Sequence, residues 1–473
     1  MPVPLPRPLP PTAARAAARL VAAAVLVAAA LLAAPEAAAQ PLAFGAADDP
    51  LELGSSPSSP DRVVLEAYGG PAFLRAGWRT ALHGEATVLR GRFSASVGGA
   101  LHPGSGGLYP READDPYDAL RAVRYVRVQP REGGRGPYAR VGPLTGVTLG
   151  TGMLARRYRT DPAWDERRIG AEAAVRGRGV RAGAFIGDVL GGGVLGAEVE
   201  VGTGLGVGRA RGLRLGLAAV HDLSLPASGE TPSGETALTG VEAVVRGDLF
   251  AQDGLRVSPY VSAAQLLGKG GGVGVGLAVE ADDLGAVARG HARLGLVASR
   301  GRFAPGFVGP FYAVAAGRQR IVAANSAFDD DPGVVLAGTP LDSLRGGLDL
   351  TADLRAVAFG RVEAMLYARR HYGPGARSAF SLRLAARAGE TRFELGLEKE
   401  GFRSLFSLFG GSLGELNTLV LDVAVPVEAL GAHAFVRSRY GYRRIPGAET
   451  EGGPRLFLVE RRFEPMLGLR ARF

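Results

Sequence analysis

Hydrophobic and polar residues alternate along most of this chain with a period of two. In residues 344–358, Leu348, Leu350 and Leu354 share one parity, whereas Asp349 and Asp353 share the other. Successive side chains of a β-strand point to opposite faces, so such a strand has one aliphatic face and one charged face. A helix would spread the same charges around its circumference. The alternation therefore predicts β-strands.

The same pattern recurs from about residue 61 to the end of the chain. It predicts further strands around residues 169–176, 195–201, 241–248, 288–296, 361–369, 380–387 and 392–398. Tight turns are expected at 177–179, 282–283, 388–390 and 430–431, and long polar connections at 104–116, 157–167, 226–235, 325–341 and 442–454. No amphipathic helical stretch of useful length interrupts the series, which excludes a parallel sheet with helical crossovers. The absence of a fixed repeat argues against a propeller or a β-helix.

The strands are too numerous for one β-sandwich, and no linker divides them after residue 61. Their polar faces carry both signs of charge, as the lumen wall of a large membrane barrel does when its aliphatic side chains face lipid. We therefore predict an all-β domain over residues 61–473, a single antiparallel transmembrane β-barrel of roughly 18 strands (about 16–20). An assignment of each loop to one side by strict alternation fails near residues 325–341, which leaves the strand count open by about two.

The N-terminal segment has the three parts of a secretory signal. Arg7, Arg15 and Arg19 precede the apolar run Leu20–Ala34, and the small residues Ala37–Ala39 follow. The apolar run is shorter than the roughly 20 residues that a membrane-spanning helix needs. We expect residues 1–39 to be a cleavable signal peptide and residues 40–60, rich in Ala, Ser, Pro and Asp, to be a flexible leader.

Composition narrows the chemistry. The chain of 473 residues has no cysteine, which excludes disulfide frameworks, thiolate metal sites and cysteine nucleophiles. The formal net charge is +9, but basic residues alternate with acidic ones instead of forming a stripe studded with aromatic residues. We therefore expect no nucleic-acid partner.

In the C-terminal segment the apolar residues stay on alternate positions, so Phe463, Leu467 and Leu469 share one face of the predicted last strand. Pro465 marks a bulge or an overhanging part of that strand. Its final residues resemble the closing strand of Gram-negative outer-membrane β-barrel proteins, a porin-like class. That family ends on an aromatic residue that the barrel-assembly machinery recognises, with apolar residues at alternate positions and a glycine upstream. The matching residues here are Gly468, Leu469, Ala471 and Phe473. The resemblance implies a barrel in the outer membrane and says little about its cargo.

Motifs of catalysis or cofactor binding are missing from the sequence. The six histidines form no metal-ligating spacing, and His221-Asp222 is a weak candidate for a barrel protease. The glycine-rich stretch Gly268–Gly276 lacks the helix that a phosphate loop needs, so a glycine-rich hairpin is favoured. The run Asp329–Asp331 lacks spaced calcium ligands. We expect no catalytic residue, no metal and no bound cofactor.

The charged parity of the predicted strands supplies the candidate functional residues, which are expected to line the lumen and tune ion selection. They are Arg289, His291, Arg293, Arg345, Asp349, Asp353, Arg355, Glu363, Arg383, Arg387, Arg392, Glu394 and Glu242. These charges either face an open pore or pair with one another and fill a closed lumen, and the sequence leaves both arrangements open.

The function that fits these features best is passive diffusion of small polar or ionic solutes through the outer membrane. The expected partners are outer-membrane lipid, the barrel-assembly machinery and the solutes themselves. A barrel-embedded hydrolase or acyltransferase is one alternative, and a structural or adhesion barrel that acts through its outer loops is the other.

Overall fold

A computed structural model describes most of the chain from residue 62 onward. The described residues are 62–74, 77–91, 93–109, 117–128, 136–161, 168–176, 179–190, 192–203, 211–222, 238–252, 254–284, 287–312, 320–323, 334–337, 345–359, 362–373, 378–388, 390–402, 416–444 and 456–473. The signal peptide expected at 1–39 and the leader expected at 40–60 lie outside them, and the first strand begins at Arg62.

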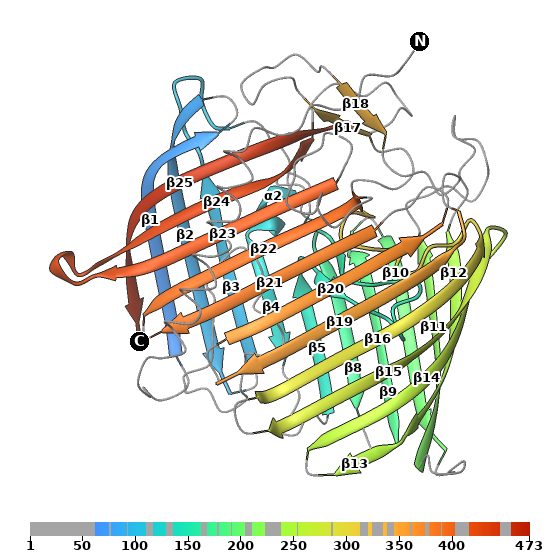
Figure 1. Cartoon of the computed structure of the whole chain (residues 1–473). Coiled ribbons are helices and arrows are strands. Elements are labelled where there is room, and N and C mark those ends of the chain that lie inside the picture. Colours follow the sequence, from blue (N-terminus) through green and yellow to red (C-terminus); the bar gives the residue numbers. More distant parts are fainter. Residues whose placement is uncertain are drawn as a thin grey trace, which may run out of the picture.

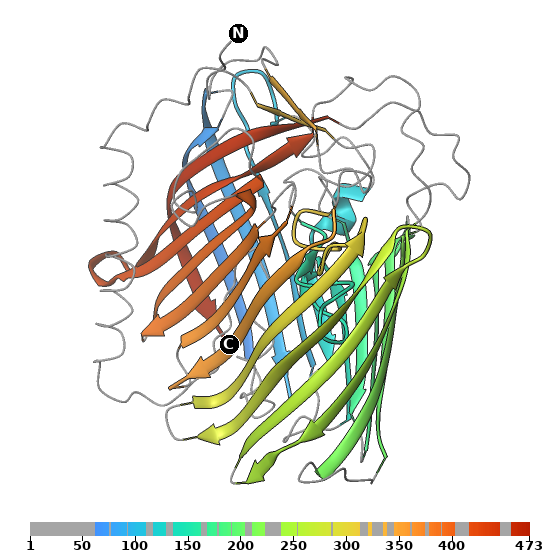
Figure 2. The same ribbon diagram turned by 45° about the vertical axis from the view of Figure 1, so that its right-hand side comes forward.

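One closed antiparallel barrel of 20 strands dominates the described part of the chain (Figures 1 and 2). The first half of the wall consists of β1 (Arg62–Leu74), β2 (Gly77–Arg90), β3 (Phe93–Leu101), β4 (Val123–Val128), β5 (Gly136–Gly142), β8 (Gly170–Arg176), β9 (Val180–Asp188), β10 (Gly192–Gly202), β11 (Arg211–Asp222) and β12 (Thr239–Asp248). The second half consists of β14 (Leu255–Leu266), β15 (Gly270–Leu284), β16 (Val287–Gly301), β19 (Leu348–Ala358), β20 (Val362–Tyr372), β21 (Ser378–Ala388), β22 (Thr391–Phe402), β23 (Leu416–Val427), β24 (Ala432–Arg444) and β25 (Leu456–Arg472).

Each of these strands pairs with its neighbour in the order given, and β25 pairs with β1 to close the ring. Seven shorter elements of the described residues are not counted among the 20 wall strands: β6 (Thr145–Val147), β7 (Tyr158–Arg159), β13 (Phe250–Gln252), β17 (Arg320–Ala323), β18 (Val334–Ala337), the helix α2 (Tyr117–Arg121) and the 3-10 turn η4 (Glu428–Leu430). In the described part of the chain, no helix has the length and apolarity to span a membrane.

The difficulty at residues 325–341 has a structural explanation. The strand β16 pairs directly with β19, so everything between them is one connection, and the β17–β18 hairpin lies in that connection instead of adding a pair of wall strands. With this connection counted once, strands alternate around the ring. Two local predictions were wrong: Asp282 and Asp283 belong to β15, and β24 continues through Tyr442 to Arg444.

The two faces of the wall differ as the alternation predicts. On β20, Glu363, Tyr367 and Arg369 are buried inside the barrel. On β11, Leu215 and Leu217 point outward, and the side chain of Leu217 is 64% exposed. An aliphatic outer face and a charged inner face are what a barrel in a bilayer requires, because hydrocarbon surrounds the outside.

Large aromatic side chains lie near both rims of this outer face, and Trp78 and Phe473 are the most exposed of those named here. Trp78 and Phe73, whose ring centroids are 5.3 Å apart, lie at one end of the β1–β2 hairpin. Phe93 and Phe473 lie at the opposite end, and both are exposed. Amphipathic or aromatic rings prefer the membrane–water interface, so their distribution marks the two edges of the lipid-facing band.

The closing strand β25 keeps the exposed parity expected from the sequence, with Leu469 and Phe473 among the most exposed apolar residues. The β1–β25 ladder runs from Val64↔Arg472 to Gly69↔Leu467 and resumes only at Phe73↔Phe463. Pro465 lies in this interruption, as its missing N–H requires. Gly468 faces Tyr68, and a Cβ atom at position 468 would collide with the Tyr68 ring and the Ala67 carbonyl.

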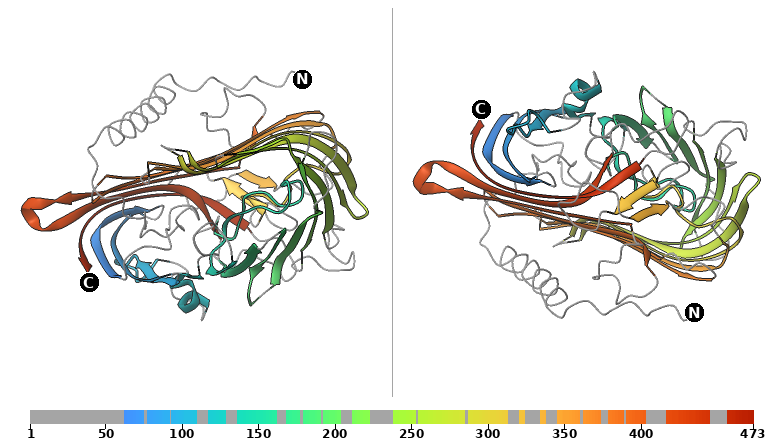
Figure 3. Two further views of the ribbon diagram at one scale, coloured as in Figure 1. Left: turned by 90° about the horizontal axis from the view of Figure 1, so that it is seen from below. Right: turned by 90° about the horizontal axis from the view of Figure 1, so that it is seen from above.

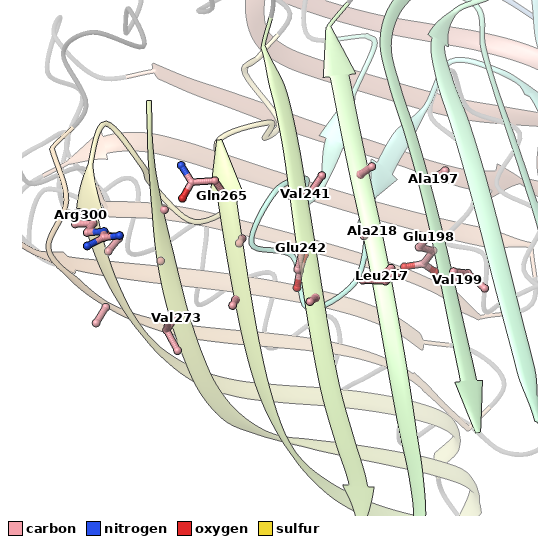
Figure 4. Close-up of a pocket in the computed structure, with 18 residues that line it drawn as sticks. Ala197, Glu198, Val199, Leu217, Ala218, Val241, Glu242, Gln265, Val273 and Arg300 are labelled. Carbon is pink, nitrogen blue, oxygen red and sulfur yellow. The ribbon is translucent and has the colours of Figure 1, made fainter. Parts of the chain in front are cut away.

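A shallow depression of about 960 Å³ crosses the outer face from β10 to β16 (Figure 4). Its lining includes outward side chains such as Ala197, Leu217, Val241 and Val273. It belongs to the lipid-facing surface, whereas the main buried hydrophobic cluster lies inside the barrel, where segments from connections occupy the interior (Figure 3).

We expect Leu217→Arg, in the middle of β11, to lower the free energy of unfolding by about 2–4 kcal/mol, because an arginine there would face the bilayer core. Leu190→Arg is the matched control, since Leu190 is equally exposed but lies in the β9–β10 turn, where the cost is about 0–1 kcal/mol. Urea unfolding in lipid vesicles measures both values. Equal costs would contradict a lipid-facing position for Leu217.

Candidate functional site inside the barrel

The interior site is built around residues 143–161, which connect β5 to β8. Instead of leaving the barrel, this segment folds inward, and Leu144, Leu154 and Tyr158 are almost fully buried. Glycines make the path possible: Gly150 has φ +55° and Gly152 has φ +84°, values that a residue with a Cβ atom rarely adopts. Below we call residues 143–161 the first inner segment.

A second inner segment, residues 302–312, follows β16 and packs against the first. Ala155 and Val308 form a parallel bridge, the Arg156 N–H donates to the Val308 carbonyl at 3.0 Å, and the Gly306 N–H donates to the Met153 carbonyl at 2.9 Å. The hydrophobic cluster joins both segments to the wall. Its members include Leu149, Met153, Leu154, Tyr158, Phe185, Val220, Leu266, Phe303, Val308 and Tyr312. The two segments therefore form one packed unit in the interior.

Charged contacts fasten the first inner segment to opposite parts of the wall. Arg157 Nη2 donates to Asp353 Oδ1 of β19 at 2.6 Å, and Arg159 pairs with Glu398 of β22. On another side, the Thr151 N–H donates to Glu242 Oε1 of β12 at 2.9 Å. Burial lowers the pKa of Arg157 to about 10, and the adjacent Asp353 carboxylate opposes this shift by favouring the charged form.

Wall arginines also hold the backbone of this segment. Arg293 of β16 donates to the Gly150 carbonyl at 2.8 Å, and Arg355 of β19 donates to the Gly146 carbonyl at 2.9 Å. From β21, Arg383 donates to the Thr145 carbonyl at 3.4 Å. These bonds satisfy backbone carbonyl groups of the first inner segment, so the wall charges help to position it.

Several of the sequence-derived candidates thus meet at this segment: Glu242, Arg293, Asp353, Arg355 and Arg383 all contact it. His291 lies beside Arg293, with 3.1 Å between His291 Nε2 and Arg293 Nε.

The remaining candidates are distributed elsewhere. Asp349 accepts from His371 at 3.0 Å, and Arg383 pairs with Glu394 at 3.5 Å. Arg392 of β22 reaches Glu66 of β1 at 2.9 Å.

Four more candidates complete the set. Glu363 and Arg387 are buried on β20 and β21. Arg345 lies exposed just before β19. The side chain of Arg289 lies outside the described residues, although its backbone pairs with Asp282.

Many wall charges pair between adjacent strands. Arg214 of β11 contacts Glu200 at 3.4 Å and Asp248, and Arg256 of β14 contacts Glu280 at 3.2 Å. Pairs of this kind compensate each charge locally, so the two signs are interleaved along this part of the wall.

Sequence reasoning missed Arg157, Arg159, Thr151 and Glu398, which fasten the first inner segment. Residues 157–167 read as a polar outer connection because of their charges. The signal that could have revealed the inward path is the apolar stretch Met153–Ala155 beside them, together with Phe303 and Phe311 in another connection. Large apolar residues in a long loop need burial, and the barrel interior provides it.

The weaker chemical candidates do not assemble into sites. His221 Nδ1 lies 2.8 Å from Thr239 Oγ1, whereas Asp222 accepts a hydrogen bond from Tyr312 at 2.6 Å, so the two neighbours have different partners. Gly268–Gly276 forms the β14–β15 turn and the start of β15, the hairpin that the sequence favours. Asp329–Asp331 lies outside the described residues.

A closed antiparallel ring with an aliphatic outer face, aromatic rims and a charged interior defines a transmembrane β-barrel of the outer-membrane type. Closure satisfies the backbone groups of every wall strand without an exposed edge, which hydrocarbon demands.

No family model and no curated protein matches the chain. Among solved structures, it is similar to OccAB3 of Acinetobacter baumannii, with 9% identity over 87% of this chain and 99% of that one, and a TM-score of 0.28. It is also similar to OpdK of Pseudomonas aeruginosa, solved with vanillate, with 10% identity over 87% and 98% of the two chains and a TM-score of 0.29. The KdgM porin, solved with oligogalacturonate, gives 7% identity over 58% and 91% and a TM-score of 0.22. Because the sequence identities and TM-scores are low, the assignment as a transmembrane β-barrel rests on the closed ring itself.

We expect Asp353→Asn to weaken the attachment of the first inner segment by about 1.5–3 kcal/mol, the worth of a hydrogen bond to a charged partner. The buried Arg157 would lose its carboxylate at 2.6 Å. A double-mutant cycle with Arg157→Ala, read by unfolding in denaturant, isolates the pair. Arg345→Ala is the control, because Arg345 is exposed before β19. A coupling energy near zero would show that this pair does not fasten the segment.

Proposed function

We propose that this protein is a restricted channel for the passive diffusion of small polar or ionic solutes across the outer membrane. The observation that carries the proposal is the charged interior of a 20-stranded ring. Barrels of about 16 or more strands have an interior too wide for wall side chains alone to fill. In this barrel the inner segments occupy part of that space, so they would set the width of the passage.

The wall charges give such a passage its selectivity. Fixed charges that line a narrow aqueous path alter the local concentration of each ion. Arg293, Arg355 and Asp353 are placed for this role because they lie where the first inner segment meets the wall. The candidates outside that contact, such as Arg387 and Glu363, would act along the rest of the path.

An enzymatic role has less support. Acyl transfer or hydrolysis needs a nucleophile within hydrogen-bond reach of a positioned base. His221 and Asp222 have separate partners, and the His291 Nε2 atom is occupied by Arg293 Nε at 3.1 Å. We therefore propose no catalytic residue and no bound cofactor. The proposed partners remain outer-membrane lipid, the diffusing solutes and the assembly machinery that would read Gly468, Leu469, Ala471 and Phe473.

Single-channel recording in a planar bilayer tests the channel directly. The refolded barrel should give stepwise conductance, and a variant in which residues 150–156 are replaced by a short Gly-Ser linker should give larger steps, because the first inner segment no longer narrows the interior. A folded wild-type barrel that passes no current, together with a conducting linker variant, would indicate a plug that must move. Absence of current in both would contradict the proposal.

Charge reversal tests the selectivity. Arg293→Glu changes the charge at the inner segment by two units, which in screened water lowers the energy of a passing cation and raises that of an anion by about 0.5 kcal/mol each. The ratio of cation to anion permeability should therefore rise about fivefold, read from the reversal potential under a salt gradient. Arg300→Glu is the control, since Arg300 is an exposed residue of the same strand. Identical reversal potentials for wild type and Arg293→Glu would place Arg293 off the ion path.

A further inference from the structure

Two histidines and a glutamate meet inside the barrel beside its closing seam, which is the pairing of β1 with β25. His83 comes from β2, His102 follows β3, and Glu464 comes from β25. His83 Nε2 lies 2.9 Å from Glu464 Oε2, and His102 Nε2 lies 3.1 Å from Glu464 Oε1. The three ligand atoms all lie within 4.8 Å of one another. We call these residues the seam cluster.

The cluster is enclosed. The side chains of His102 and Glu464 are each 1% exposed, and that of His83 is 10% exposed. In both histidine–glutamate contacts, an imidazole Nε2 atom faces a carboxylate oxygen. That nitrogen carries either a proton or a lone pair, depending on the tautomer. A proton or a metal ion must therefore lie in each contact, because bare lone pairs at this distance would repel.

The donor set suits a borderline divalent metal ion. Zn²⁺ binds imidazole nitrogen and carboxylate oxygen at about 2.0–2.2 Å in a tetrahedral arrangement, which puts neighbouring ligand atoms about 3.3 Å apart. The two nitrogen–oxygen separations already lie close to that value. Three protein ligands would leave the fourth position to water.

The surroundings can accept the added charge. One cation beside the cluster is Arg437 of the neighbouring strand β24, whose Nη1 lies 3.5 Å from His83 Nδ1. Its guanidinium is held by Asp422, at 3.0 Å from Nη2, and the same carboxylate also pairs with Arg439 at 2.8 Å. Metal binding through Nε2 requires the Nδ1–H tautomer of His83, and a small displacement of Arg437 toward Asp422 would allow it.

The position of the cluster gives the metal a task. The β1–β25 ladder has no pairs between Gly69↔Leu467 and Phe73↔Phe463, and Glu464 lies in that gap. On β1, Gly70 and Ala72 present little side chain to the interior, so groups from β2 and β25 can meet across it. A metal ion held there would join strands on both sides of the seam where backbone bonds are missing.

We propose that His83, His102 and Glu464 bind one divalent transition-metal ion, with Zn²⁺ as the best fit, and that this ion fastens the closing seam of the barrel. The proposal is independent of solute transport. Metal binding is then coupled to the folded ring, because the ligands come from residues 83, 102 and 464 and meet only when β25 has paired with β1.

The test uses the full barrel purified without a histidine tag, stripped with a chelator and reloaded with equimolar ZnCl₂. Metal analysis should give one Zn²⁺ per chain, and the temperature at which the barrel unfolds on a gel should rise with Zn²⁺. His102→Gln and His83→Gln should each weaken binding at least about 100-fold. His371→Gln is the matched control, because His371 is a buried histidine on one carboxylate, Asp349, at 3.0 Å.

Two results would overturn the proposal. One is a wild-type barrel that neither retains Zn²⁺ nor unfolds at a higher temperature with it, which would leave a hydrogen-bonded cluster only. The other is undiminished binding in the His83→Gln/His102→Gln double variant. If a variant fails to fold, X-ray absorption of the Zn²⁺-loaded wild type decides, since the seam cluster requires two imidazole ligands and any smaller number contradicts it.

Discussion

The constraint on which this structure depends is that a backbone surrounded by hydrocarbon must satisfy its own hydrogen bonds. A sheet meets that demand only if its first and last strands pair, so the contact between β1 and β25 conditions everything else. The weak stretch of that contact is where Pro465 withholds an N–H. In the paired stretch beside it, Gly468 lets the Tyr68 ring approach. Side chains rather than backbone then supply the contacts across the gap, with Glu464 reaching His83 and His102.

Closure also inverts the usual distribution of residues. The outer face takes the aliphatic side chains and leaves the interior to arginines and carboxylates, which pair between adjacent strands and with the inner segments. Within that polar interior the two inner segments bring their own apolar core, built from Met153, Leu154, Phe303 and Val308. The barrel therefore contains a small hydrophobic unit held inside a charged shell by ion pairs and hydrogen bonds to carbonyl groups. This arrangement lets the interior be specific in shape while its surface stays compatible with water.

The strands could be predicted from the sequence because alternation is a local property. Leu350 and Asp353 reveal their opposite faces within one strand, and the outer exposure of Leu469 and Phe473 follows in the same way. The predicted range of strand number includes the observed 20, and the uncertainty arose where the β17–β18 hairpin adds strands without adding to the wall. Contacts between distant segments were not predictable. Arg159 and Glu398 are separated by 239 positions, and His83 and Glu464 by 381, so no spacing rule could bring them together before the ring was known.

The bridge between Ala155 and Val308 has a consequence for the order in which the protein matures. Its two partners belong to connections on either side of the strands from β8 to β16. The connection that contains Ala155 is fastened to β19 and β22, and the one that contains Val308 accepts a hydrogen bond from Arg369 of β20. Long-range contacts of this kind form only after the intervening chain has been arranged. The inner unit therefore acquires its full set of attachments only after the later wall strands have taken their places in the ring.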